Sequence, residues 1–524
     1  MVLCVLTVMS PGKPLANENL TGLYVRSIEQ VMRLDADEID IGTAALIVAE
    51  EWSDMVHGRR YQNELDRMAY EIQARISEKK LGSSYKAVEV MNDYLFGELG
   101  FTAVKEATDP NDLFLHSVID NKRGYCLSLS ILYLALGERL GLPLYGVVVP
   151  GHFFVRYDSG TVRLNIETTS SGNSADDEHY KKEFGVPQDG RQGIYLQNLN
   201  KLQTLGCLFN NFGNVYNEAG NIDAAQRALE LAVEINPGLA ESRVNLGNIY
   251  LRKDRIEDAI YEYRQAIDIN PDGGKTYHNL GNAYLRKGWT NDAMEAYEQA
   301  IRLDPNYVDA YVNLAITYGQ IKMYAKAQQV LKEAALIDPG RAGIYVKRGD
   351  IYLQSEDYQS ALEEYKTALR IKRNDAGAHF GTGLCYGKLG MPKNEIQSYE
   401  EALRAEPNMF AARAHLGDAH FGQRDYAKAI KQYKICIELQ PDSSAIWYNI
   451  GAAYSNLEKY ADAAVYYEKA LAQDPKMADA HHGLGFVYYQ LKNYEQAYRH
   501  LTIAGQLGIE PDPKLLKAIE RKLR

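Results

Sequence analysis

The chain has 524 residues, of which 46% are hydrophobic and 24% charged, a composition that excludes collagen-like and wholly disordered proteins. Its net charge of −11 at pH 7 offers no overall positive field to phosphates, so we expect no nucleic-acid partner. The length exceeds that of one compact core and predicts several domains or a repeat array.

The beginning of the chain carries a short apolar run, MVLCVLTVM, without a basic leader. No run reaches the roughly 18 apolar residues that cross a bilayer, so we expect no transmembrane segment. Residues 1–35 are predicted to form a poorly ordered N-terminal segment. A cytoplasmic location is favoured, and secretion or membrane association is the alternative. The cysteines are odd in number and widely spaced, which predicts neither a disulfide framework nor a zinc site: Cys4, Cys126, Cys207, Cys385 and Cys436.

Residues 36–120 have the apolar periodicity of helices, and no strand is predicted there. A long helix is predicted from about Cys126 to near Gly141, with Gly124 just before it. The Cys126 thiol then lies at a helix N-terminus, where partial positive charge and unpaired N–H groups favour a thiolate and can form an oxyanion hole.

Two β-rich runs follow, YGVVVPGHFFVRY and TVRLNIETT, and the turn signal between them predicts an antiparallel hairpin. If Ser159 and Gly160 form a two-residue loop, His152 on the first strand faces Glu167 on the second. A three-residue loop would place Ile166 there instead. With Cys126, the first register gives the parts of a Cys-His-acid site for acyl transfer through a thioester.

Five short motifs occur here in a characteristic order: Asp109-Pro110-Asn111, Arg123-Gly124-Tyr125-Cys126, Gly141-Leu142-Pro143-Leu144, Pro150-Gly151-His152-Phe153 and Asn165-Ile166-Glu167. On these motifs, residues 36–172 resemble a SirB-type transglutaminase-like domain. The resemblance implies a papain-like α+β core in which Cys126 is the nucleophile, His152 the base and Glu167 the orienting acid. Asn165 is an alternative orienting residue. A cysteine protease or transglutaminase-like acyl transferase is the implied enzyme, and a degenerate, non-catalytic domain is the alternative.

Residues 173–205 are polar with Gly and Pro and predict a flap or linker, from which His179 and Tyr180 could approach the cleft. The chain then becomes periodic. Prolines recur at intervals of 34 residues, with one step missed at Arg373: positions 237, 271, 305, 339, 407, 441 and 475. A small residue and a tyrosine keep the same period, and each unit contains two apolar stripes with helical spacing.

This pattern resembles the tetratricopeptide repeat family and implies an all-α solenoid of nine helix-turn-helix repeats over residues 206–511. The amphipathic tail, residues 512–524, is predicted to cap the last repeat. In this family the inner helices line a groove that receives peptides, so we expect a protein or an extended peptide as partner.

Asparagines recur at the sixth and ninth positions of the first repeats: Asn211, Asn245, Asn279 and Asn313, and Asn214, Asn248 and Asn282. Amides in register can pair with the backbone of an extended peptide. The series resembles the asparagine ladder of O-linked N-acetylglucosamine transferases, and simple solvation of these side chains is the alternative. No phosphate-binding loop, dinucleotide fingerprint or zinc-protease motif occurs, so no cofactor and no metal are expected.

Overall fold

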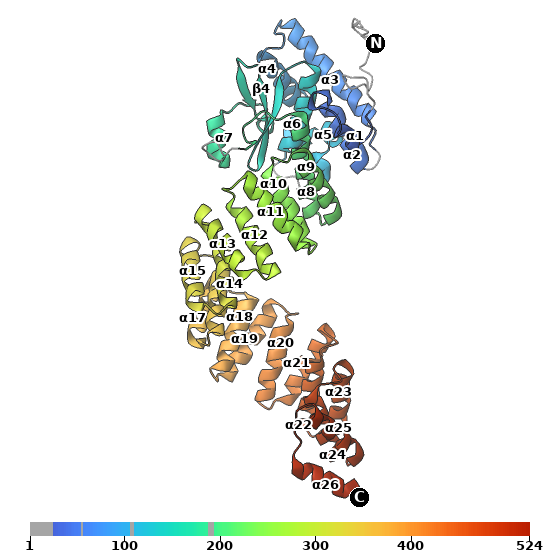
Figure 1. The fold of residues 1–524 in the computed structure, drawn as a ribbon, viewed down its shortest axis with the longest axis vertical. Helices are drawn as coiled ribbons and strands as arrows, with labels where there is room; N and C mark the ends of the chain where they lie inside the picture. The colour runs from blue at the N-terminus through green and yellow to red at the C-terminus, as the bar shows by residue number, and fades with distance from the viewer. Residues whose placement is uncertain (1–24, 54–55, 105–108, 187–192, 524) are drawn as a thin grey trace. The chain divides into compact units, whose positions relative to one another are not determined.

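The computed structural model describes residues 25–53, 56–104, 109–186 and 193–523 (Figure 1). Cys4 and most of the predicted N-terminal segment lie outside these residues. The chain divides into two compact units, residues 1–305 and residues 306–524. The first contains the α+β part and the first three helix pairs, and the second contains the remaining helix pairs.

The α+β part of the first unit is built around one helix, α6 (Cys126–Arg139). All residues from Cys126 to Gly137 are buried, because the sequence CLSLSILYLALG is apolar or small on every face and must be enclosed. Strands β3 (Leu144–Val149) and β4 (His152–Asp158) pack against α6, as do several helices. The other helices of this part are α1 (Ile28–Val31), α2 (Ile41–Trp52), α3 (Gly58–Glu78), α4 (Lys86–Asn92), α5 (Leu115–Asn121) and α7 (Asp177–Phe184).

The sheet contains three antiparallel strands in the order β3-β4-β5, with β5 at Arg163–Ile166. The first β-rich run of the sequence is therefore two strands, because the chain reverses at Pro150-Gly151, where Gly151 takes a φ of +73°. β1 (Thr102–Ala103) lies in the region where no strand was predicted, and it forms a two-residue parallel pair with β2 (Arg123–Gly124).

The predicted register of the hairpin is wrong. The strands pair Asp158 with Arg163 and Val155 with Ile166, so the loop has four residues rather than two. Hydrogen bonds from Gly160 N–H to Asp158 and from Val162 N–H to the Ser159 hydroxyl stabilise this longer loop. The register is displaced by two residues, and an even displacement leaves every side chain on the face that the prediction gave it.

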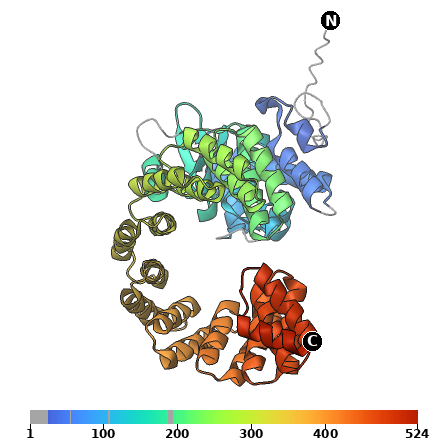
Figure 2. The same cartoon turned by 60° about the horizontal axis from the view of Figure 1, so that its bottom comes forward.

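Three helix pairs complete the first unit: α8 (Lys201–Glu218), α9 (Ile222–Ile235), α10 (Ala240–Arg252), α11 (Ile256–Ile269), α12 (Gly274–Lys287) and α13 (Thr290–Leu303). Figure 2 shows them in green to yellow-green as neighbouring antiparallel helices. The first pair, α8 and α9, shares a core with the α+β part, and Trp52 of α2 packs on Phe209 and Phe212 of α8. Leu199, just before α8, bonds to the backbone of β3. The junction between the two parts is therefore a packed interface.

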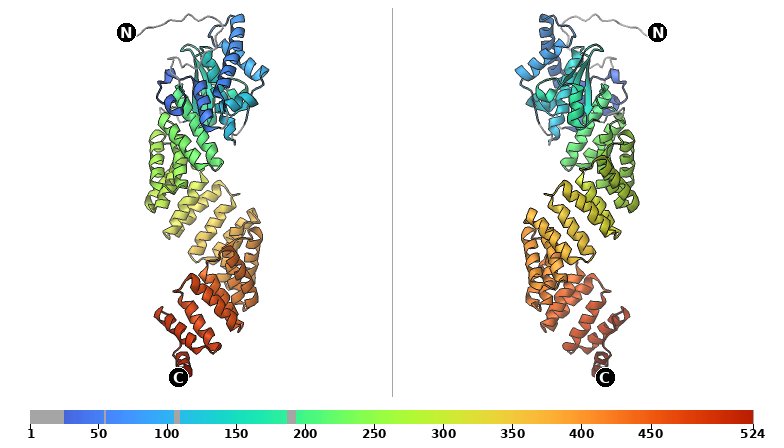
Figure 3. Two further views of the ribbon diagram at one scale, coloured as in Figure 1. Left: turned by 90° about the vertical axis from the view of Figure 1, so that its right-hand side faces the viewer. Right: turned by 90° about the vertical axis from the view of Figure 1, so that its left-hand side faces the viewer.

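The second unit continues the helix pairs, which Figure 3 shows from yellow to red. It contains α14 (Val308–Gln320), α15 (Tyr324–Ile337), α16 (Ala342–Gln354), α17 (Tyr358–Ile371), α18 (Ala376–Lys388), α19 (Pro392–Ala405), α20 (Phe410–Gly422), α21 (Tyr426–Leu439), α22 (Ser444–Asn456), α23 (Tyr460–Gln473), α24 (Ala478–Gln490), α25 (Tyr494–Gln506) and α26 (Pro513–Leu523). In the described residues, α8–α25 form the nine predicted helix pairs. Ile519 of α26 is buried against Leu501 of α25, so α26 covers the last pair.

The repeat period has a direct packing cause. In most repeats the small residue of the first helix lies against a tyrosine ring of the second, and a Cβ on Gly349 would come within 2.6 Å of the Tyr365 ring. These second-helix tyrosines are buried and fill the space between the two helices of a repeat. Where proline is missing at Arg373, Asp375 accepts a hydrogen bond from Ala378 N–H and caps α18, so the repeat keeps its form.

Candidate functional site

Cys126 is the first residue of α6 and is buried. Gly124 allows the chain to enter the helix closely, because a Cβ there would lie 2.8 Å from the Ser128 hydroxyl. The Cys126 carbonyl accepts hydrogen bonds from the hydroxyls of Ser130 and Thr168. These contacts fix the backbone that carries the thiol at the N-terminus of α6, where the first turn of N–H groups has no partner within the helix.

His152 is the first residue of β4, directly after the turn at Pro150-Gly151. Glu167 follows the end of β5 and starts the short 3-10 helix η4 (Thr168–Ser170). Because the register is displaced by an even number, Glu167 lies diagonally from His152 on the same face, and His152 Nε2 is 2.6 Å from Glu167 Oε2. Each side chain is 14% exposed.

The pKa values of this pair are shifted towards the charged forms. Burial opposes charge on His152, but its hydrogen bonds to Cys126 and Glu167 outweigh burial and raise the pKa of His152 to about 9. Burial likewise opposes charge on Glu167, yet hydrogen bonds from His152 and Thr169 keep the pKa of Glu167 below its ordinary value. At neutral pH the structure therefore favours an imidazolium between a carboxylate and the Cys126 sulfur.

Helix α7 contributes two site residues that the sequence did not identify as such. The Tyr180 hydroxyl, 3.3 Å from Glu167 Oε2, donates to the same oxygen that His152 contacts. The Phe184 ring stacks on His152 with centroids 4.8 Å apart and an interplanar angle of 8°. The sequence predicted that both His179 and Tyr180 could approach the cleft. Tyr180 contacts Glu167, whereas the His179 side chain is exposed. The aromatic spacing of four residues on one helix face is the signal that could have found Phe184.

A buried arginine anchors α7. Arg156 of β4 is 1% exposed and donates hydrogen bonds to Asn165 and Asp177. Asn165 also donates to Asp177. Asn165 is thus committed to this anchor and does not contact His152, so its proposed role as an alternative orienting residue is wrong.

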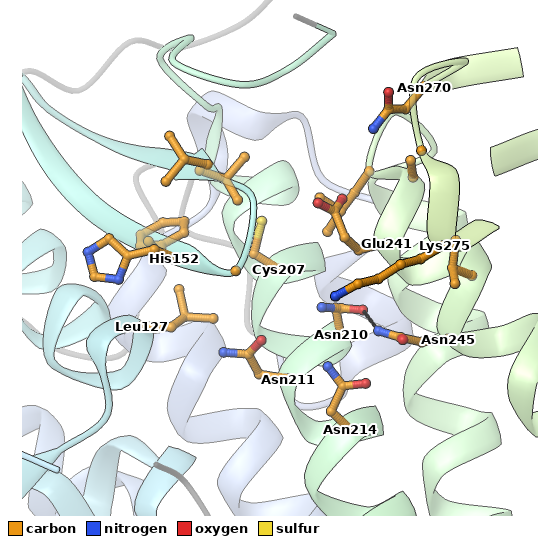
Figure 4. A pocket seen from close by; sticks show the side chains of 18 of the residues that line it. Leu127, His152, Cys207, Asn210, Asn211, Asn214, Glu241, Asn245, Asn270 and Lys275 are labelled. Carbon is orange, nitrogen blue, oxygen red and sulfur yellow. Dashed lines mark hydrogen bonds between the residues drawn. The ribbon is translucent and has the colours of Figure 1, made fainter. Parts of the chain in front are cut away.

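A cavity of about 580 Å³ opens beside Cys126 and His152. Its other walls come from the first repeats, through Asn211 and Asn214 of α8 and Asn245 of α10 (Figure 4). Both groups of residues lie in the first unit. The predicted nucleophile and part of the predicted peptide groove therefore line a single cavity.

The predicted asparagines fall into two groups. Asn248 and Asn282 accept hydrogen bonds from tyrosine hydroxyls of the second helices, Tyr263 and Tyr297. Asn245 and Asn279 donate to asparagines of the preceding repeat. Asn211 and Asn214 have no side-chain hydrogen bond within the described residues, and Leu229 stands in the first repeat where most later repeats have a tyrosine. Asn313 is half-buried in the second unit and is not among the residues that line this cavity.

Cys207, Cys385 and Cys436 are free and buried, and burial raises the pKa of Cys385 to about 12 and of Cys436 to about 11. Burial also raises the pKa of Cys207, which lines the cavity. The described residues contain no group of three or more His, Cys, Asp or Glu side chains that could bind a metal ion. None of the described helices is both long and apolar enough to cross a membrane.

Comparison with known proteins identifies relatives for both parts. The family model of the transglutaminase-like superfamily matches residues 59–192. Models of the tetratricopeptide repeat match residues 208–239, 247–288, 274–307, 296–329, 349–390, 376–409, 396–444 and 444–477.

Among curated proteins, a UPF0162 protein of Xylella fastidiosa is 26% identical over 209 residues, which cover 38% of this chain and 73% of that protein. Human F-box only protein 21 is 32% identical over 76 residues, or 14% of this chain and 12% of that protein.

Solved structures similar to the chain include YrrB, described as a TPR protein with an unusual peptide-binding site. It is 24% identical with a TM-score of 0.32 and covers 36% of this chain and 96% of its own. PilF of Pseudomonas aeruginosa is 17% identical with a TM-score of 0.36, and covers 40% and 96%. The family models and the observed fold agree on the organisation of the chain, which has a domain of the transglutaminase-like superfamily at its N-terminus followed by an array of tetratricopeptide repeats.

Proposed function

We propose that the protein is a cysteine-dependent amide hydrolase or acyltransferase that receives a protein substrate through its first repeats. The observation that carries this proposal is the shared cavity, in which Cys126 and His152 face side chains of the repeats. Cys126 is the proposed nucleophile, His152 the base and Glu167 the residue that orients His152. The proposed location is the cytoplasm, where a nucleophilic thiol stays reduced.

The chemistry follows from the charges of the pair. Positive charge on His152 beside the sulfur stabilises the thiolate, which attacks an amide carbonyl carbon. The C–N bond breaks as the imidazolium transfers its proton to the leaving amine, and an acyl thioester remains on Cys126. Water or a second amine then attacks the thioester, His152 accepts the proton of this nucleophile, and the thiolate leaves. The N–H groups at the start of α6 are the proposed donors to the oxyanion.

The orientation of His152 supports these roles. Nε2 bonds to Glu167, so Nδ1 is the ring nitrogen left to exchange a proton with Cys126. The carboxylate fixes the tautomer and stabilises the imidazolium, as the acid does in a Ser-His-Asp site.

Asn211 and Asn214 are the proposed contacts for substrate backbone. Both line the cavity, and neither amide is used by another side chain of the described residues. An amide with its donor and acceptor available can pair with both groups of a peptide unit. The other predicted asparagines of the first repeats already hold neighbouring side chains, which makes them weaker candidates.

The test of the catalytic proposal is the pH dependence of Cys126 alkylation by iodoacetamide, followed by mass spectrometry in wild type and His152→Ala. An ordinary thiol titrates near 8.5. We expect wild-type Cys126 to react rapidly below about pH 7 and His152→Ala to lose this reactivity. Alkylation of Cys126 that is slow, or equal in the two proteins, would refute the catalytic proposal and leave a non-catalytic peptide-binding scaffold.

The groove is tested separately with Leu229→Tyr, which supplies the hydroxyl that later repeats direct at the equivalent asparagine. Peptides are first selected on wild type from a random displayed library. We expect Leu229→Tyr and Asn214→Ala to weaken their binding about tenfold, since the first substitution occupies the Asn214 amide with a hydroxyl and the second removes it. Unchanged affinity in both variants would exclude Asn214 as a peptide contact.

A further inference from the structure

Helix α7 lies along β4 in a fixed register. Every second residue of a strand points to the same face, about 6.7 Å further along, and residues three or four apart on a helix lie on one side, about 4.5 to 6 Å apart. Because these spacings are similar, side chains of α7 can pair with alternate residues of β4. Three such pairs follow one another, with the two elements running in opposite directions: His152 with Phe184, Phe154 with Tyr180, and Arg156 with Asp177.

The two aromatic pairs contact the proposed base and its acid. The Phe184 ring stacks on His152 with an interplanar angle of 8°. The Tyr180 ring stacks on Phe154 with centroids 4.0 Å apart, and its hydroxyl donates to Glu167. A stacked imidazole cannot tilt without separating the rings or moving Phe184. The position of α7 therefore restricts the orientation of His152.

The third pair is ionic and stands at the opposite end of the register from His152. Arg156 is 1% exposed. Its guanidinium donates to three separate segments of the chain, at Asn165, Asp177 and the carbonyl of Leu196. A buried ion pair adds little net stability compared with apolar side chains of similar volume, because both charges lose their hydration. The pair therefore indicates a geometric role, which is to fix where α7 begins on the sheet.

Helix α7 acts on the site from outside the cavity. The described residues that line the cavity beside Cys126 include His152 but no residue of α7. A substrate can thus occupy the cavity while α7 stays in place, and α7 affects the reaction through His152.

We infer that α7 is a positioning element for His152, and that the ion pair of Asp177 with Arg156 keeps Phe184 stacked on the imidazole. The inference rests on the proposed function and deepens it by naming the element that holds the proposed base towards Cys126. Without the ion pair, α7 shifts along β4, Phe184 leaves the imidazole, and His152 turns more freely. Asp177 is thus a positioning residue, because it acts on His152 through α7.

The test follows the proton between His152 and Glu167 in the full chain. Histidines are labelled at the ring nitrogens, and the low-field NMR signal of this proton is assigned by its loss in His152→Ala. The pair is buried and Nε2 is 2.6 Å from Glu167 Oε2, so the proton exchanges slowly with water while the imidazole is held in place. The rate constant of Cys126 alkylation by iodoacetamide is measured on the same samples at pH 7.

Asp177→Asn removes the charge of the ion pair, and Phe184→Leu removes the stacking ring without a change in charge. Asp66→Asn is the matched control, because Asp66 pairs with an arginine whose side chain is 10% exposed, Arg139, in an ion pair that contains no residue of α7. We expect the signal to be lost and alkylation to slow about tenfold in Asp177→Asn and in Phe184→Leu, within the loss that a misplaced reacting group causes. Asp66→Asn should keep the signal and the rate of wild type.

An unchanged signal and rate in Asp177→Asn, or equal losses in Asp177→Asn and Asp66→Asn, would overturn the inference. A loss in Asp177→Asn that Phe184→Leu does not share would overturn it as well, since the effect would then bypass the stacked ring. If Asp177→Asn does not fold, Phe184→Leu decides the inference: a retained signal refutes it and a lost signal supports it.

The failure of the proposed function gives a different result. If wild-type Cys126 is inert to iodoacetamide, the proposed function fails, and the NMR signal alone decides the inference. Loss of the signal in both variants would then keep α7 as the element that orients His152. Absence of the signal in wild type would refute the inference.

Discussion

The charge on His152 is expected to depend on Glu167, and Glu167→Gln tests this directly. The pKa of His152 rises from 6.5 to about 9, which corresponds to about 3 kcal/mol in favour of the protonated ring at about 1.4 kcal/mol per pKa unit. The substitution keeps the size of the side chain and removes its charge at the 2.6 Å contact. Burial of His152, which lowers its pKa, is then opposed mainly by Cys126.

We expect the His152 midpoint to fall by about two pH units in Glu167→Gln, within the range that one adjacent charge produces. The assay is NMR titration of histidines labelled at the ring carbon, with the His152 signal assigned by its loss in His152→Ala. Cys126→Ser serves as a control that removes the other hydrogen-bonding partner and keeps Glu167. A wild-type midpoint at or below 6.5, or a midpoint unchanged in Glu167→Gln, would refute the electrostatic account of the site.

The same pair predicts how stability depends on pH. A histidine whose pKa is raised on folding stabilises the protein below its unfolded pKa of 6.5, and this contribution is lost as pH rises through about 9. The melting temperature of wild type should therefore exceed that of Glu167→Gln by more at pH 6 than at pH 10. A difference that grows at the higher pH would contradict the sign of the shift.

Two further substitutions test packing around the site and within the repeats. Tyr180→Phe removes the hydroxyl that donates to Glu167. We expect it to lower the free energy of unfolding by about 1 kcal/mol and to slow Cys126 alkylation near pH 7. If neither quantity changes, this hydrogen bond has no role in the site. Gly349→Ala should destabilise the repeats by about 1–3 kcal/mol in chemical unfolding, because its Cβ meets the Tyr365 ring. The control, Gly343→Ala, has open space around its Cβ and should be neutral or stabilising. Equal effects of the two substitutions on the free energy of unfolding would exclude this packing cause.

Local patterns determined the repeats. The 34-residue period, the small residue and the apolar stripes specify each helix pair through contacts with its neighbours alone, and the structure confirms the nine pairs in its described residues. The same reasoning failed to separate the asparagines. Their availability depends on whether a tyrosine or Leu229 stands on the second helix, a contact between residues about 15 apart in sequence that the ladder pattern does not contain.

The sequence by itself determined that Cys126 starts α6 and that His152 lies on a strand, and it placed Glu167 on the following strand, which the structure ends one residue earlier, at Ile166. Only the tertiary structure decided the four-residue loop, the diagonal contact of His152 with Glu167, and the stacking of Phe184 on His152. It also brought the repeats to the same cavity. The physical reason is that periodicity reports which face of an element is buried, whereas the partner on that face depends on long-range packing between elements.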